Sequence, residues 1–583
     1  MGWFSNLNTK WKLIAGFLVV AAITACVGGI GFWGANRLAG NVDAMANLIA
    51  WEEDAYRSEG RVTYMADRFL LDILTDTTER APTGLSREAE DVLRAFAASP
   101  KRRYPARLPY VIAETEKGFG FPGAGRNAAH NLPLDGNPRH DAAAREAFNR
   151  GAAALFVPPE ELDAALAAFD CHAAQGRVKE SLHPMAHRDP PAPVLPEPDW
   201  APPGGSASAM AALDRWFVSL VEANPGLRVR IGNPDELASN KMGGTLQRLR
   251  HRVNAPEPGV AEDLHGAIIT ALNEEAVAAA ALANKGGLNL VVSYEAFAVK
   301  MLGLLRQETI FARRQREVGQ PPRWLPVPLV VTSHTWENSK NEQSHQDPTI
   351  GEALLGEMSD TARVLFPVDG NTAVAALRDV YAGRGQVACV VVSKREVEEH
   401  FDAEAAQRLV RDGAGQVVGD PLEADVQLVA IGAYQLDAAL AAQRHLAARG
   451  RRACVSVVLE PGRLRVPRDA IEAAFVADDA RVQALFPPEL PRVLLSHTRP
   501  EPMLGVLRRI DSGPARTRAL GYISRGGTLD VPGMLFANRC TWAHAVDACA
   551  AVAGWPREEL LDAPLRDALD GRGDPRVLQD RAP

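Results

Sequence analysis

The chain has few cysteines, and none of them belongs to a recognisable pair motif. Its 583 residues include six cysteines, and no two are spaced Cys-x-x-Cys. We therefore predict neither a metal site of the zinc type nor a disulfide framework, and a reducing compartment fits this usage. Runs of lysine or arginine are also missing, and the formal net charge is -8. A nucleic-acid partner is disfavoured, because such proteins neutralise phosphates with clustered basic side chains.

Proline and glycine are concentrated in one place rather than spread evenly. Residues 184–205 contain eight prolines and two glycines, which predicts an extended linker between domains. Hydrophobic residues make up 46% of the chain and charged residues 23%. These fractions are ordinary for globular proteins, and the length predicts three or four domains.

One apolar run is long enough to cross a membrane. Residues 13–35 carry no charge, Lys10 and Lys12 precede them, and Arg37 follows. About 20 apolar residues suffice for a membrane-spanning helix, so we expect a membrane anchor or an uncleaved signal, with a buried core helix as the alternative. Residues 1–45 resemble the first membrane span of bacterial chemoreceptors. Residues 46–100 predict a helical segment of unclear origin, with no recognisable chemistry.

Beyond the linker, short apolar runs alternate with helical segments. Such alternation is typical of β-α-β units. We predict an α/β fold with one parallel sheet in residues 206–395 and another in residues 396–583. The expected strands are Leu227–Ile231, Leu290–Phe297 (running into a helix), Trp324–Val331, Thr361–Pro367, Val387–Ser393, Val426–Ile431, Ala453–Leu459 and Val493–Ser496.

Polar residues follow several of these strands. After Trp324–Val331, residues 333–348 bring together two histidines, a lysine, amides and carboxylates. Ligand sites of parallel sheets form at the carboxyl ends of the strands, so residues 333–348 indicate a binding site; a solvated loop is the alternative. Glu295 and Lys394 also follow strands, although Glu295 could be a helix N-terminal charge and Lys394 an ordinary solvated lysine.

A glycine-rich segment lies before the linker. The sequence after Leu108–Ala113, an expected strand, contains Lys117, four glycines and His130. A loop of this kind lets backbone amides approach an anion closely. A plain cluster of turns is an equally good interpretation.

Two short motifs together resemble a known family. Ser293-Tyr294-Glu295-Ala296-Phe297 and, about fifty residues later, Ser344-His345-Gln346-Asp347-Pro348 are similar to segments of the thiamine-diphosphate-dependent phosphoketolases, relatives of transketolase. The similarity covers roughly residues 104–570, and it includes a Gly-x-Pro-Asp-Glu-x-x-Ser-Asn run that ends at Asn240.

The resemblance implies roles for individual residues. Glu295 contacts the aminopyrimidine ring of the cofactor, and Lys117 lies near the cofactor. His345 and His130 move protons on the substrate. The substrate would be bound by Ser239, Lys394, Asn341 and Gln346. A carboxylic acid next to a ring nitrogen can favour the tautomer that removes the thiazolium proton, which is the reason for the role given to Glu295.

The same resemblance implies a reaction and its partners. A ketose phosphate, xylulose 5-phosphate or fructose 6-phosphate, reacts with inorganic phosphate to give acetyl phosphate, with thiamine diphosphate and Mg²⁺ as cofactors, in a cytoplasmic homodimer. Residues 101–183 would then be the remnant of a diphosphate-binding domain. Residues 206–395 would be the pyrimidine-binding domain, and residues 396–583 a C-terminal transketolase-like domain.

Two departures from the family pattern stand out. No Gly-Asp-Gly segment occurs, so we expect the diphosphate and Mg²⁺ site to be missing and the enzyme to be truncated and impaired. Where typical members have a histidine, this chain has Lys340, which does not normally exchange protons near neutral pH. The alternative interpretation is a non-catalytic, membrane-tethered pseudo-enzyme or sensor-like protein.

Overall fold

The computed structural model describes residues 116–130, 134–174, 189–234 and 237–583. The chain divides into two compact units between residues 173 and 174. No helix within the described ranges is long and apolar enough to cross a bilayer. The predicted span at residues 13–35, the chemoreceptor-like residues 1–45 and the helical segment 46–100 all lie outside these ranges.

The described part of the first unit is helical. It contains η1 (Asn127–His130), α4 (Ala142–Ala154) and α5 (Pro159–Ala174). The carboxylate of Asp141 caps α4 by accepting hydrogen bonds from the amides of Ala143 and Ala144, at 2.8 and 3.0 Å. A capping acid before the first turn is a strong helix start.

Eight parallel strands form the larger sheet, in the order β4-β3-β5-β2-β6-β7-β9-β8. The predicted parallel sheet in residues 206–395 is therefore confirmed. Its strands are β2 (Val229–Gly232), β3 (His251–Arg252), β4 (Glu262–Asp263), β5 (Ile268–Ile269), β6 (Leu288–Tyr294), β7 (Val327–Thr332), β8 (Ala362–Leu365) and β9 (Val387–Val392). All pairings in it are parallel.

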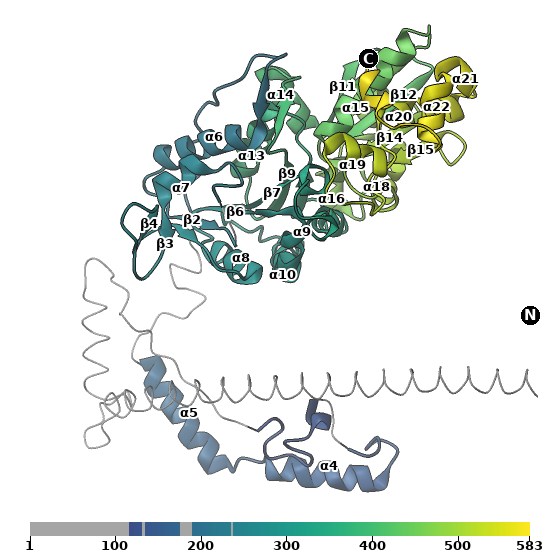
Figure 1. The fold of residues 1–583 in the computed structure, drawn as a ribbon. Helices are drawn as coiled ribbons and strands as arrows, with labels where there is room; N and C mark the ends of the chain where they lie inside the picture. Colours follow the sequence, from purple (N-terminus) through teal and green to yellow (C-terminus); the bar gives the residue numbers. More distant parts are fainter. Residues whose placement is uncertain (1–115, 131–133, 175–188, 235–236) are drawn as a thin grey trace, which may run out of the picture. The chain divides into compact units, whose positions relative to one another are not determined.

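Both faces of this sheet are covered, which explains its apolar strand sequences. Figure 1 shows α6 and α13 over one face and α8 and α10 over the other. Neighbouring residues of β6 point to opposite sides, because side chains alternate along a strand. Leu290 and Val292 join the core beneath α6 and α13, whereas Val291 joins the core beneath α8 and α10.

The helices of this domain connect the strands. They are α6 (Ala209–Ala223), α7 (Gly243–Leu249), α8 (Glu274–Leu282), α9 (Glu295–Ala298), η3 (Val299–Met301), α10 (Leu302–Glu317), α11 (His334–Glu337), η4 (Gln343–His345), α12 (Thr349–Leu355) and α13 (Gly370–Ala382).

The second sheet is mixed, not wholly parallel. Its order is β11-β13-β12-β14-β15, with β11 (Ala414–Val418), β12 (Val426–Ile431), β13 (Ala453–Val458), β14 (Arg492–Ser496) and β15 (Thr517–Leu520). β11 pairs antiparallel with β13, while the other pairs are parallel. The prediction of a parallel sheet in residues 396–583 is thus right for four strands and wrong for β11. β11 and its partner β13 are separated in the chain by β12 and α15, so the apolar pattern of β11 alone does not reveal its direction.

Helices surround this second sheet. They are α14 (Ala403–Asp412), α15 (Ala433–Ala447), η5 (Pro461–Leu464), α16 (Ala470–Ala473), α17 (Asp479–Leu485), α18 (Pro500–Val506), η6 (Arg508–Ile510), α19 (Val531–Ala537), α20 (Trp542–Ala553), α21 (Arg557–Leu560), α22 (Ala563–Leu569) and α23 (Val577–Asp580).

The first α/β domain reaches past residue 395. β10 (Glu396–Glu398) pairs antiparallel with β1 (Ser206–Ser208), and α14 packs on α13. The described part of the proline-rich segment is irregular but fixed to the same domain. Asn224 exchanges two hydrogen bonds with the backbone of Val194, and Asn371 does the same with Ala201.

A buried ion pair joins the two sheets. Arg363 of β8 donates two hydrogen bonds to Glu460, just before η5, at 2.7 and 2.8 Å, and neither side chain is more than 3% exposed. Burial alone would raise the pKa of Glu460, but Arg363 and Arg463 together keep it below its ordinary value. Such a pair is geometrically specific because both partners are planar.

Replacing one partner of this pair should be costly. We expect Glu460→Gln to lower the free energy of unfolding by about 3–5 kcal/mol, because the guanidinium of Arg363 stays buried without full compensation. The matched control is Glu404→Gln, which breaks an ion pair with Arg408 whose glutamate side chain is 82% exposed; it should cost no more than about 1 kcal/mol. Urea unfolding followed by circular dichroism measures both. Equal losses for the two variants would show that Asp379, which also contacts Arg363, compensates for Glu460.

Candidate functional site

The register of the larger sheet aligns the ends of its central strands. Tyr294 of β6, Thr332 of β7 and Val392 of β9 lie side by side across the sheet. The residues that follow these three strands therefore begin at one edge, which is the carboxyl edge of a parallel sheet. Ligand sites of open parallel sheets form at this edge.

Glu295 is the first residue after β6, and its side chain has no exposed surface. The hydroxyl of Thr335 donates to Oε2 at 2.6 Å. Nε2 of His497 lies 2.8 Å from Oε1 and 3.1 Å from Oε2. Buried carboxyl groups need such partners, because the cost of removing them from water is high.

The single turn α11 organises the surroundings of Glu295. Thr335 contacts Glu295, and the indole of Trp336 donates to the backbone oxygen of His497 at 3.0 Å. Glu337, the last residue of α11, accepts hydrogen bonds from the Tyr434 hydroxyl at 2.9 Å and from the amide of Lys394 at 3.2 Å. In the predicted site segment 333–348, Ser333 and residues 335–338 are thus buried, whereas residues 340–344 are exposed.

His345 lies beside the helix that carries Glu295. Its ring packs edge-on against Phe297, with centroids 4.7 Å apart, and Phe297 belongs to α9. The hydroxyl of Ser344 lies 2.9 Å from Nδ1 of His345. His345 remains partly exposed, so a ligand at this edge could reach it.

Ser239 and Lys394 also come together. Nζ of Lys394 is 3.5 Å from the backbone oxygen of Ser239 and 5.3 Å from the centre of the Tyr294 ring. The hydroxyls of Ser239 and Tyr294 lie 2.6 Å apart. Tyr294 directly precedes Glu295, so both predicted groups adjoin the segment that carries Glu295.

Charge is concentrated around Lys394. Burial lowers the pKa of Lys394, the Glu337 carboxylate opposes this shift, and Lys241, Arg395 and Lys340 lower it further. The guanidinium of Arg395 donates to the Glu337 carbonyl at 3.0 Å. Several cations near one serine suit an anionic ligand group such as a phosphate.

Asn341 and Gln346, the other predicted substrate residues, differ in their surroundings. Asn341 is exposed, and its amide bonds to the side chain of Asn338 at 3.2 Å. Gln346 is buried: its Nε2 donates to the carbonyls of Asn338 and Gly527, at 2.8 and 2.9 Å, and its Oε1 accepts from the amide of Gly527. The amide of Gln346 therefore connects the two α/β domains.

Lys117 and His130 lie in the other unit of the chain. Nζ of Lys117 is 2.6 Å from Nδ1 of His130, and both are exposed. The glycine-rich loop between them consists of successive turns, in which the amides of Phe119, Phe121 and Ala124 bond to carbonyls within the loop. Those amides are already used, which favours the turn-cluster interpretation over an anion site.

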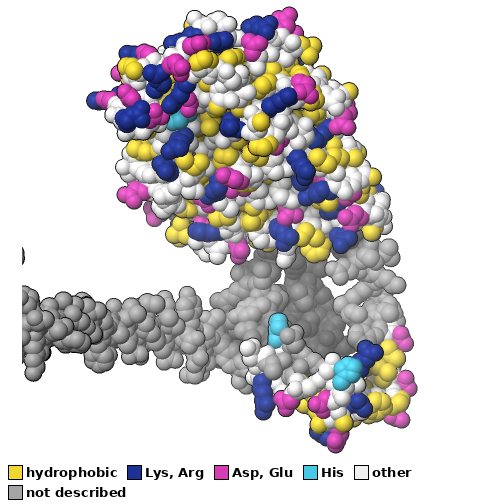
Figure 2. All heavy atoms as spheres, turned by 90° about the vertical axis from the view of Figure 1, so that its right-hand side faces the viewer, with side chains coloured by type: hydrophobic (Ala, Val, Ile, Leu, Met, Phe, Trp, Pro, Cys, Tyr) yellow, Lys and Arg dark blue, Asp and Glu magenta, His cyan; other side chains and the backbone are white. Residues whose placement is uncertain are grey.

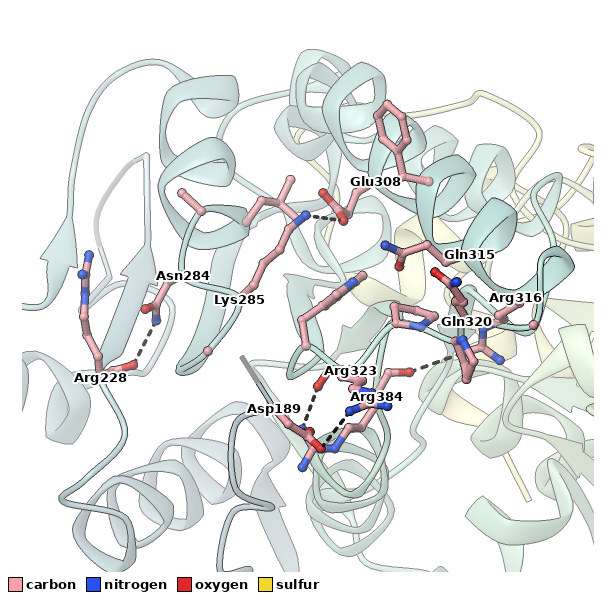
Figure 3. A pocket seen from close by; sticks show the side chains of 18 of the residues that line it. Asp189, Arg228, Asn284, Lys285, Glu308, Gln315, Arg316, Gln320, Arg323 and Arg384 are labelled. Carbon is pink, nitrogen blue, oxygen red and sulfur yellow. Dashed lines mark hydrogen bonds and ion pairs between the residues drawn. The ribbon is translucent and has the colours of Figure 1, made fainter. Parts of the chain in front are cut away.

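A large hollow lies at the opposite edge of the sheet. It measures about 1360 Å³ and is lined by residues that precede β2, β6, β7 and β9, among them Lys285 and Arg384 (Figure 3). Lys285 pairs with Glu308 at 2.8 Å, and Asp189 lies between Arg323 and Arg384. This hollow is at the amino ends of the strands, away from Glu295.

Sequence reasoning missed His497 and Arg499, which come from the second sheet. Arg499 reaches Asp347 at 2.9 Å and Glu352 at 2.6 Å, so it fixes the loop that carries His345. A signal was present: Ser-His-Thr occurs after two buried strands, at residues 333–335 and at residues 496–498. The histidine of the second, His497, contacts Glu295.

The predicted absence of a nucleic-acid surface rests on charge distribution. On the face seen in Figure 2, basic and acidic side chains of the larger unit are interspersed.

Within the described residues, no group of three or more histidine, cysteine or acidic side chains is placed to bind a metal ion.

Comparison with known proteins shows that part of the chain is similar to one protein family. Residues 211–382 match the family model of D-xylulose 5-phosphate/D-fructose 6-phosphate phosphoketolase. This range includes Ser239, Glu295 and His345 and ends before Lys394. The resemblance read from the sequence is confirmed at the level of similarity to that family.

Proteins described as probable phosphoketolases are similar in sequence to this chain. A probable phosphoketolase of Mycolicibacterium paratuberculosis is 25% identical over 520 residues, which cover 80% of this chain and 63% of the relative. One from Streptomyces avermitilis is 28% identical over 316 residues, covering 51% and 38%. Transketolase from Leishmania mexicana aligns with a TM-score of 0.46 at 17% identity, covering 71% of this chain and 54% of that one. The chain thus spans less than two thirds of the length of these proteins.

The buried acid at the edge of this site gives a pH prediction. Burial raises the pKa of Glu337 above its ordinary value, despite the hydrogen bonds that it accepts. The folded state therefore holds the proton more tightly than the unfolded state, and stability falls as pH rises from about 4.3 through the folded pKa. We expect Glu337→Gln to remove this decline. Thermal midpoints between pH 4 and pH 8 measure it, with Glu423→Gln, an exposed site, as the control. Parallel curves for the wild type and Glu337→Gln would contradict the prediction.

Proposed function

We propose that the chain is part of a phosphoketolase-like carbon–carbon lyase. It carries the residues that bind the aminopyrimidine ring of the cofactor and the phosphate of the substrate. The substrate class is a ketose phosphate, such as xylulose 5-phosphate or fructose 6-phosphate, with inorganic phosphate as co-substrate and acetyl phosphate as product. The observation that carries this proposal is the grouping of a fully buried Glu295 with Ser239, Tyr294 and Lys394 at one sheet edge. The family match over residues 211–382 supports it.

The cationic group at Lys394 supports the phosphate end of the substrate. Lys394 and Arg395 follow β9, while Ser239 and Lys241 belong to the segment after β2. Two chain segments far apart in sequence therefore supply donors to one place. A phosphate ester takes three or more hydrogen bonds, so a serine and several cations match its chemistry. Lys340 adds positive charge where relatives of the family have a histidine.

The described residues fit thiamine diphosphate at one end. A carboxyl group at a buried strand end, with fixed neighbours, suits a ring nitrogen of the aminopyrimidine, and Glu295 is that group. When bound, the cofactor would supply a nucleophilic carbon and an electron sink for carbon–carbon bond cleavage, and Glu295 would hold its aminopyrimidine ring. For the metal end, no group of three or more histidine, cysteine or acidic side chains is suitably placed in the ranges that the structure describes.

Glu295 is closed off in this chain. Both of its oxygens already accept hydrogen bonds, and no surface of the side chain is exposed. A ring nitrogen that approaches Glu295 must therefore enter beside Thr335 and His497 after local side-chain movement. His345, partly exposed and next to Phe297, is placed to exchange a proton with a substrate oxygen.

Loss of Lys394 should weaken substrate binding selectively. A hydrogen bond to a charged group contributes roughly 1.5–3 kcal/mol, so Lys394→Ala should weaken the binding of xylulose 5-phosphate about 10- to 100-fold. Calorimetric titration without cofactor measures this directly. The control is Lys285→Ala, which removes a lysine from the opposite edge of the same sheet. If both variants bind like the wild type, the phosphate site is elsewhere.

Activity itself tests the assignment of Glu295. With thiamine diphosphate, Mg²⁺ and inorganic phosphate present, we expect acetyl phosphate to form from xylulose 5-phosphate only slowly, because the described residues fit one end of the cofactor. Glu295→Gln should reduce the rate at least 100-fold, because an amide cannot supply the acid. The control is Glu423→Gln, which alters an exposed glutamate that precedes β12. A chain that binds the sugar phosphate without forming any product would favour the non-catalytic alternative.

A further inference from the structure

The contact between Glu295 and His497 joins residues 202 positions apart in the chain. Glu295 lies at the carboxyl edge of the larger sheet, and His497 follows β14 of the smaller one. The exposed fractions of the two side chains are 0% and 2%. A polar contact this well buried is stronger than one in water, and its loss leaves Oε1 of Glu295 without its hydrogen-bond donor.

The imidazole of His497 is held rigidly. The backbone amide of His497 donates to the carbonyl of Ile431 at 2.8 Å, and its carbonyl accepts from the indole of Trp336. The ring packs near Phe366, with centroids 5.6 Å apart. Gly432 has a φ of +110°, and a Cβ there would lie 3.1 Å from Cβ of His497. Close packing on several sides fixes where Nε2 points.

The same turn secures both partners. Thr335 donates to Oε2 of Glu295, and the next residue, Trp336, donates to the backbone of His497. The geometry of the pair is therefore set by α11 and by the two sheet edges together. A side chain locked by neighbours in this way is preorganised, which is what a precise site requires.

Two other ionisable groups near Glu295 are the thiol of Cys389 and the hydroxyl of Tyr522. Cys389 of β9 is fully buried, and burial followed by the charge of Glu295 raises the pKa of its thiol. The hydroxyl of Tyr522 donates to the backbone oxygen of Gln346 at 2.7 Å. Hydrogen bonds to the Glu295 carboxylate itself come from Thr335 and His497.

We propose that His497 is a positioning residue that fixes the carboxyl group of Glu295 for its ligand. The second α/β domain thereby supplies part of the site instead of only packing against it. The proposal rests on the function proposed above. His497 acts through Glu295, since its Nε2 is bonded to the Glu295 carboxyl group.

The test compares two replacements of His497 in two backgrounds. His497→Gln keeps an N–H donor, and His497→Leu fills similar space without one. Each is made in the wild type and in Glu295→Gln, using the full chain. Calorimetry measures the dissociation constant of thiamine diphosphate in the presence of Mg²⁺. His445→Leu is the control, because His445 is another buried histidine of the second domain that bonds to a backbone oxygen, that of Leu560.

A positioning role predicts a definite pattern. His497→Leu should weaken binding at least tenfold, and His497→Gln less than threefold. In the Glu295→Gln background, His497→Leu should change binding by less than twofold, because the group through which it acts is already altered. An equal loss in both backgrounds, or the same loss in His445→Leu, would overturn the proposal and show a merely structural histidine.

A second measurement separates this proposal from the proposed function. In the chain labelled with ¹⁵N-histidine, the ring resonances of His497 are those missing from His497→Gln. They should move in Glu295→Gln and stay in place in Glu423→Gln, which alters an exposed glutamate. If the wild type binds no thiamine diphosphate, the proposed function fails, and the ring resonances alone decide about His497. Resonances that do not move in Glu295→Gln overturn the positioning role in either case.

Discussion

The closed contact around Glu295 is the constraint on which the arrangement of the two α/β domains depends. A carboxyl group with no exposed surface is tolerated only where donors are aimed at it. One donor comes from α11 and the other from the loop after β14. The carboxyl ends of both sheets must therefore face each other. Further contacts, such as Arg499 with Asp347 and Glu352, stabilise this facing arrangement.

The site contains two different electrostatic environments close together, one around Glu295 and one around Lys394. The Glu295 side chain is buried and has few hydrogen-bond partners. Several cations lie around Lys394, which is partly exposed. Glu337 separates the two regions and contacts both of them through α11 and the amide of Lys394. A site with one buried acid and one group of cations suits a ligand that is neutral at one end and anionic at the other.

Much of the fold could be predicted from sequence periodicity. The buried strands β6, β7, β9, β12 and β13 follow from short runs of branched apolar residues, and their parallel direction follows from the helices between them. The antiparallel direction of β11 could not be predicted in this way. The pairing of β10 with β1 could not be predicted either, since a strand of three residues is too short to show an alternating apolar pattern. Direction and partner are long-range properties of such short segments.

The sequence by itself determined which residues stand at strand ends, and so placed Glu295, Ser239, His345 and Lys394 at one edge before any coordinates. Their order after buried strands is a local property, and it also carried the similarity to phosphoketolases. Only the tertiary structure decided that His497 meets Glu295 and that the amide of Gln346 is occupied by Gly527. Those contacts depend on how one sheet docks on another. The docking angle is set by the sum of many apolar contacts, and no local pattern records that sum.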